Sequence, residues 1–159
     1  MRSRTRHGAV HRTTVSSMAL INALTGNASL MKEEKAREQY GPWLLENERL
    51  EGAFELVLDS FCLTNLRLIA LDREGPVNPK VDVRSIPLAS IVDVTARTAG
   101  IGIDDSDLTI TYITSPRLRA HTVEYSTMTF TFNKSFDIAG LYRHLMTIAQ
   151  RNYASLNDA

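Results

Sequence analysis

The pattern of hydrophobic and polar positions has a period of two between residues 48 and 132. This period is typical of β-strands, because successive side chains of a strand point to opposite faces of the sheet. Met128, Phe130 and Phe132, which alternate with threonines, give the clearest strand pattern in the chain. Asp59-Ser60 is expected to form the turn of the first hairpin. The pattern predicts seven strands, over residues 53–58, 61–64, 67–72, 81–86, 91–97, 108–113 and 127–132.

A helical period follows the last predicted strand. The apolar residues at helical spacing are Ile138, Leu141, Leu145 and Ile148. Ser135 or Asp137 can cap the N-terminus of this helix. A helix with one apolar face most simply closes an open end of a sandwich or barrel. The expected fold class is therefore mainly β: a seven-stranded antiparallel sandwich or barrel capped by a C-terminal helix.

Before residue 48 the sequence predicts a short helical hairpin over residues 18–45. Ser29 can cap its second helix, which continues to Tyr40 before Gly41-Pro42 interrupts it. Four apolar residues mark the first helix: Met18, Leu20, Ile21 and Leu24. Burying each large apolar side chain contributes roughly 1.5–3 kcal/mol, so leaving this face exposed would be unfavourable. We expect these four residues to form an oligomer interface and the protein to be a cyclic homo-oligomer.

Charge is unevenly distributed along the chain, although the net charge is zero. Residues 1–17 contain four arginines and no acid, whereas residues 18–159 contain 14 basic and 18 acidic residues. This mildly acidic body argues against nucleic-acid binding by phosphate neutralisation. Residues 1–17 lack apolar periodicity, which predicts a disordered basic extension. We favour an extension upstream of a start at Met18; a basic tail that contacts anionic lipid or nucleic acid and a targeting peptide are the alternatives.

The single cysteine, Cys62, excludes an internal disulfide and fits a reducing compartment. No stretch of the sequence approaches the roughly 18 consecutive apolar residues of a membrane-spanning helix. We therefore expect a cytoplasmic protein. Its main domain is predicted to span residues 48–151, followed by a flexible tail over residues 152–159.

Several local motifs add a family resemblance to this outline. They follow one another in the order Ala23-Leu24 with Gly26-Asn27-Ala28-Ser29, Glu48 through Ala53-Phe54, Thr64-Asn65 with Arg67-Leu68, Ser85-Ile86-Pro87, and Thr98-Ala99-Gly100. With these motifs, the chain resembles the bacterial pleckstrin-homology (PH) domain family over residues 18–151. The resemblance implies a PH-like barrel that tends to form ring-shaped homo-oligomers.

No arrangement of residues points to catalysis, a cofactor or a metal. Cys62 lies in the apolar run Phe61-Cys62-Leu63, which favours core packing over a nucleophile. A calcium loop needs ligands spread over about 12 residues and a closing glutamate, which the turn at Asp104, Asp105 and Asp107 lacks. We expect a protein that is not an enzyme. The turn Thr64-Asn65-Leu66-Arg67 is interpreted as structural, because Thr and Asn side chains bond nearby backbone groups.

Binding is the expected function, and the sequence leaves two hypotheses. In the first, the subunits of a homo-oligomer form grooves that hold a protein or peptide partner, with unpaired strand edges able to accept an added strand. In the second, the basic tail and a loop patch at Arg117 and Arg119 contact anionic lipid. Specific phosphoinositide binding would need converging basic side chains at the first hairpin, and residues 55–63 contain none. We therefore favour the first hypothesis and take Arg117 and Arg119 as candidate ligand-binding residues.

Overall fold

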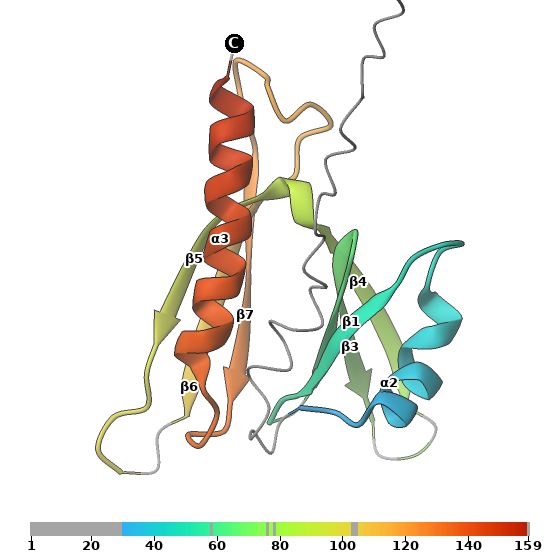
Figure 1. Cartoon of the computed structure of the whole chain (residues 1–159). Coiled ribbons are helices and arrows are strands. Elements are labelled where there is room, and N and C mark those ends of the chain that lie inside the picture. The colour runs from blue at the N-terminus through green and yellow to red at the C-terminus, as the bar shows by residue number, and fades with distance from the viewer. Residues whose placement is uncertain (1–29, 58, 76, 78, 103–104, 159) are drawn as a thin grey trace, which may run out of the picture.

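The computed structural model describes residues 30–57, 59–75, 77, 79–102 and 105–158 (Figure 1). Two antiparallel sheets and a long C-terminal helix make up most of this part of the chain, which confirms the mainly β prediction with seven strands. The helical elements are α2 (Glu33–Tyr40), η1 (Gly41–Trp43), η2 (Leu88–Ser90) and α3 (Ile138–Asn157). The strands are β1 (Leu50–Glu55), β2 (Ser60–Thr64), β3 (Arg67–Glu74), β4 (Lys80–Pro87), β5 (Ile91–Arg97), β6 (Ser106–Ile113) and β7 (Tyr125–Phe132).

Within each sheet, every strand pairs with its neighbour in sequence. The first sheet has the order β1-β2-β3-β4 and the second has the order β5-β6-β7. Short connections favour antiparallel pairing of this kind. The short helix η2 forms the corner at which the chain passes from the first sheet to the second. Ser60 belongs to β2 and pairs with Glu55, so it lies in the strand and not in an Asp59-Ser60 turn as predicted.

The main core lies between the two sheets and beneath α3. All five phenylalanines of the chain meet there, and their ring centroids lie 4.3–5.9 Å apart in five pairs. Phe61 of β2 stacks on Phe54 of β1 and on Phe130 of β7, and so joins the two sheets. We call the face of the first sheet that contributes Phe54 and Phe61 its inner face.

A second, smaller core covers the outer face of the first sheet. Ala36 and Tyr40 of α2 pack there against Ala53, Cys62 and Ile69. Because both faces of β2 are covered, all of its residues are buried. Cys62 is fully buried and burial raises the pKa of its thiol to about 12, which confirms the prediction of a packing role.

Helix α3 packs mainly on β5 through its apolar face. Asp137 caps it by accepting a hydrogen bond from the N–H of Gly140 (3.1 Å), as one of the two predicted caps. The helix does not end near residue 151. It continues to Asn157, so most of the predicted flexible tail is helical. Asn152 accounts for part of this extension, because its amide donates to the carbonyls of Leu88 (2.6 Å) and Ile91 (2.8 Å) at the corner between the sheets.

The N-terminal hairpin differs from the prediction. Its first helix, with Met18, Leu20, Ile21 and Leu24, lies outside the described residues. The second helix begins at Glu33, not after Ser29. Residues 30 and 31 are instead extended beside β1: Leu30 forms a bridge with Phe54, and the N–H of Met31 donates to the carbonyl of Ala53 (2.8 Å). Backbone pairing with β1 therefore replaces the first turn of the expected helix.

Candidate functional site

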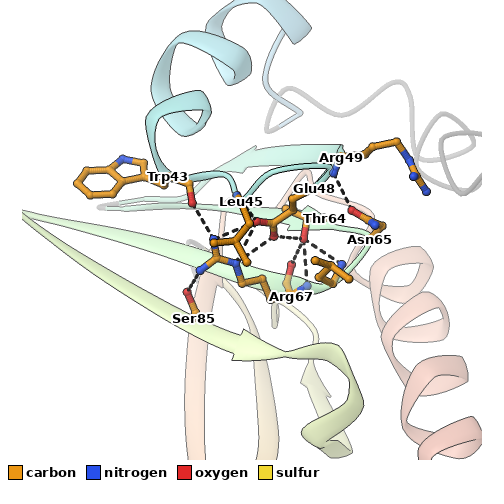
Figure 2. A network of polar contacts seen from close by, with 9 residues as sticks. Trp43, Leu45, Glu48, Arg49, Thr64, Asn65, Arg67 and Ser85 are labelled. Carbon is orange, nitrogen blue, oxygen red and sulfur yellow. Dashed lines mark hydrogen bonds and ion pairs between the residues drawn. The ribbon is translucent and has the colours of Figure 1, made fainter.

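An ion pair between Glu48 and Arg67 lies at the centre of a polar network (Figure 2). Arg67, the first residue of β3, places Nε 3.0 Å from Oε1 and Nη2 3.0 Å from Oε2 of the Glu48 carboxylate. The hydroxyl of Thr64 donates to the same carboxylate (2.6 Å). The Glu48 side chain is fully buried and that of Arg67 is 20% exposed. The pair is therefore well shielded from water.

The turn before β1 brings Glu48 into this position. Asn47 has a φ of 64°, in the left-handed region that asparagine tolerates better than most residues. The N–H of Glu48 donates to the carbonyl of Leu45 (3.0 Å), and the N–H of Leu45 donates back to the Glu48 carboxylate (2.8 Å). These reciprocal bonds fix the chain between η1 and β1.

Burial raises the pKa of the Glu48 carboxyl, but the hydrogen bonds from Arg67, Leu45 and Thr64 outweigh it and hold this pKa at about 2. The same pairing raises the pKa of Arg67. Both groups are therefore charged at neutral pH. Breaking a buried pair of this kind is costly, because removal of one partner leaves an uncompensated buried charge.

The remaining donors of Arg67 connect three elements. Nη2 donates to the carbonyl of Trp43 in η1 (2.7 Å), and Nη1 donates to the hydroxyl of Ser85 in β4 (2.8 Å). One side chain thus holds η1 against the outer side of β3 and β4. Figure 2 shows the Trp43 ring extending away from the network.

A groove lies beside this anchored tryptophan, on the outer face of the first sheet. Its volume is about 350 Å³. It is lined by Trp43 of η1, by Leu71, Arg73 and Val81 of β3 and β4, and by Lys35, Glu38 and Gln39 of α2. We call it the Trp43 groove. Its lining combines three apolar residues with four polar or charged ones, and a mixture of apolar surface and polar groups is typical of ligand-binding sites.

The Trp43 groove borders an unpaired sheet edge. β4 is the last strand of the first sheet, and among the described residues no strand pairs with its far side. Trp43 is 42% exposed and Val81 is 40% exposed. An edge strand offers a row of free N–H and C=O groups, so this region combines backbone donors and acceptors with an apolar surface.

Comparison with known proteins identifies the family. The sequence description of the bacterial PH domain family matches residues 19–149. The chain belongs to this family. It is 40% identical over 93 residues to the uncharacterized protein YjqA of Bacillus subtilis, a match that spans 58% of this chain and 74% of YjqA.

Two solved structures support the assignment of this bacterial PH domain. A PH domain from Shewanella amazonensis is 30% identical, with a TM-score of 0.56, and the match covers 81% of this chain and 97% of that one. A DUF1696 family protein with a PH domain from Shewanella loihica is 26% identical, with a TM-score of 0.56 and coverage of 78% and 98%.

Most of the motifs behind the family resemblance meet in the polar network. Glu48, Thr64-Asn65, Arg67 and Ser85 are all members of it. The predicted structural role of the Thr64–Arg67 turn is confirmed, because the Thr64 hydroxyl accepts from the N–H groups of Leu66 (3.1 Å) and Arg67 (3.0 Å). Sequence reasoning missed the ion pair itself, since 18 residues separate Glu48 from Arg67 and no local pattern relates them.

The structure does not bring Arg117 and Arg119 to the Trp43 groove. They lie in the loop between β6 and β7, near the end of α3, whereas the groove lies beside α2 (Figure 1). Arg117 is exposed, and the Arg119 guanidinium donates to the carbonyl of Ser155. Arg119 therefore contributes to holding the loop against α3.

Acidic groups lie near the first hairpin. Burial, the charge of Asp72 and a hydrogen bond to that residue raise the pKa of Asp59. This pair disfavours an anionic headgroup at the turn.

Within residues 30–158, apart from the few positions not described, no group of three His, Cys, Asp or Glu side chains could hold a metal ion. No described helix is both long and apolar enough to cross a membrane.

Proposed function

We propose that this PH domain is a non-catalytic scaffold that holds an extended peptide segment of a partner protein in the Trp43 groove. The observation that carries the proposal is the position of this groove beside the unpaired β4 edge. Peptides that bind a sheet edge gain affinity from backbone hydrogen bonds and specificity from neighbouring side-chain pockets. Both features are available at this one place.

The anchoring of Trp43 supports the same function. Tryptophan is enriched among the residues that contribute most to protein–protein binding. Here its backbone carbonyl is held by Arg67, which is itself fixed by the buried Glu48 carboxylate. A surface that is ordered before binding loses less conformational entropy when the partner docks. The polar network therefore prepares the groove and does not itself contact the ligand.

The Trp43 groove is tested with peptides selected from a random display library. Trp43 is the only tryptophan in the chain, so its fluorescence reports directly on the groove. We expect selected peptides to shift this emission to the blue and to bind the Trp43→Ala variant at least about tenfold more weakly, as measured by the anisotropy of labelled peptide. Tyr153→Ala, which removes an exposed aromatic ring from α3, is expected to leave binding unchanged. Selected peptides that bind both variants equally and leave Trp43 emission unmoved would contradict the proposal.

We also propose that the domain assembles into a ring-like homo-oligomer. The support is the apolar set Met18, Leu20, Ile21 and Leu24, which needs a surface to cover it. Light scattering is expected to give a mass several times that of one 17.8 kDa chain. Changing Leu20 and Ile21 together to Asp should yield a smaller species with an intact β-sheet circular dichroism signal. A wild-type mass near that of one chain at micromolar concentration would show that the ring does not form. A ring that is unchanged in the double variant would show that another surface holds the subunits together.

A further inference from the structure

The β4 edge carries an alternating pattern of side chains. Val81 lines the Trp43 groove and Val83 packs against the outer core, so both belong to the outer face. Lys80, Asp82 and Arg84 alternate with them and therefore belong to the other face. All three charged residues are exposed, and none forms an ion pair with any residue that the structure describes. The edge thus presents the charges plus, minus, plus on one face and valines on the other.

Asp82 has an unfavourable neighbour within its own sheet. The register of β3 and β4 places it directly opposite Asp72. Like charges at directly opposite positions of an antiparallel pair destabilise it, whereas opposite charges stabilise it. A cationic side chain on the free side of β4 would offset this repulsion. Asp82 is therefore the charge of β4 that gains most from a neighbour on the free side, because the same register places Lys80 opposite Glu74 and Arg84 opposite Ala70.

We infer that β4 accepts an extended peptide as a fifth strand and that this peptide carries the pattern acid, apolar, base, apolar, acid. This inference rests on the proposed function and specifies the chemistry of the partner. The acids lie opposite Lys80 and Arg84, and the base lies opposite Asp82. The apolar residues lie opposite Val81 and Val83, on the face where the Trp43 ring completes the groove. The pattern reads the same in both directions, so it holds for a parallel or an antiparallel strand.

Charge argues for a partner peptide and against a second copy of β4. Two antiparallel copies that overlap fully over residues 80–84 would place Lys80 opposite Arg84 and Asp82 opposite Asp82. Every charged position would then face a like charge. The complementary segment is acidic at its ends, which is the opposite of β4 itself.

Two synthetic peptides of equal length test the inference. One contains Glu-Val-Lys-Val-Glu and the other contains the charge-reversed Lys-Val-Glu-Val-Lys. We expect the first to bind the full chain about tenfold more tightly, from three favourable cross-strand charge pairs, and to shift the emission of Trp43. The surface variant Lys80→Glu, Asp82→Lys, Arg84→Glu should reverse the preference. Equal affinity of the two peptides for the wild type would overturn the charge pattern.

Backbone methylation separates strand addition from simple charge attraction. Alternate backbone N–H groups of a strand point to opposite edges, so two methylated peptides are made, each N-methylated along one edge. The form methylated on the edge that faces β4 loses its hydrogen bonds to β4 and keeps every side chain. Binding of the Glu-Val-Lys-Val-Glu peptide should fall at least about tenfold in one of the two methylated forms. If both methylated peptides bind as tightly as the unmethylated one, the inference of a fifth strand is wrong.

The outcomes also distinguish this inference from the function on which it rests. Library peptides that bind at Trp43 but lack the alternating charge pattern would reject the inference and leave the proposed function standing. A library that yields no peptide acting on Trp43 would reject both. If the mass doubles with increasing concentration and the triple charge variant abolishes this doubling, the β4 edge binds a second copy of the chain. That result would overturn the inference of a peptide partner.

Discussion

Replacing Phe61 with alanine is expected to lower the free energy of unfolding by about 3–5 kcal/mol, which is a large fraction of the total for a single domain. Phe61 is fully buried and its ring contacts those of Phe54, Phe130 and Phe132, which come from both sheets. The substitution removes this contact and leaves a cavity where the sheets meet. Urea denaturation followed by circular dichroism measures the change.

Tyr125→Ala is the matched control for Phe61→Ala. Tyr125 is an aromatic residue in the same pair of sheets, but it is 60% exposed at the start of β7. Its truncation should change the free energy of unfolding by less than about 1 kcal/mol. Equal destabilisation by the two substitutions would contradict the view that the phenylalanine cluster holds the sheets together.

Replacing Arg67 with methionine is expected to destabilise the fold by about 3–5 kcal/mol, because the buried Glu48 carboxylate loses its partner. Methionine keeps an apolar stem of similar length, so the effect comes from loss of the guanidinium group, both its charge and its hydrogen bonds to Trp43 and Ser85. Arg37→Met provides the control: Arg37 pairs with Glu33, but both side chains are more than half exposed, and such pairs contribute about 1 kcal/mol or less. Adding Glu48→Gln to Arg67→Met should restore part of the lost stability.

Acid is expected to weaken the same connection. The pKa of Glu48 lies at about 2 in the folded protein, below its ordinary value of 4.5. Its contribution to stability is therefore complete above pH 4.5 and is lost as the pH falls toward 2. Asp59 acts in the opposite direction, because its raised pKa favours the folded state at low pH. Denaturation measured across this pH range should show a smaller loss for Glu48→Gln than for the wild type, and parallel curves would exclude Glu48 as the cause.

The sequence predicted the strands and the C-terminal helix because their signals are local. Alternation or a short apolar run identifies each strand from its own residues, and Asp137 with the apolar residues that follow identifies α3. The prediction ended α3 too early because the bonds from Asn152 reach the distant residues Leu88 and Ile91. Likewise, the start of α2 depended on pairing between Leu30 and Phe54, which no propensity of Ser29 could reveal.

The candidate site was harder to predict because it depends on tertiary neighbours. Trp43, Leu71 and Val81 line one groove, but they come from η1, β3 and β4. The sequence indicated that unpaired strand edges can accept a partner, yet only the sheet order identifies β4 as the unpaired strand beside the groove. Charge in the sequence drew attention to Arg117 and Arg119, whereas the arginine that organises the site, Arg67, is mostly buried.

The order of strand pairing has a consequence for how the chain folds. Every ladder between the named strands joins sequence neighbours, so none of these ladders requires closure of a loop longer than the connection at residues 114–124. Local pairing lowers the entropy lost before contacts form and favours rapid folding of each meander. Ile138, Leu141 and Leu145, however, belong to α3, which is synthesised after all seven strands. The ribosome thus releases both sheets before the helix that seals the core between them.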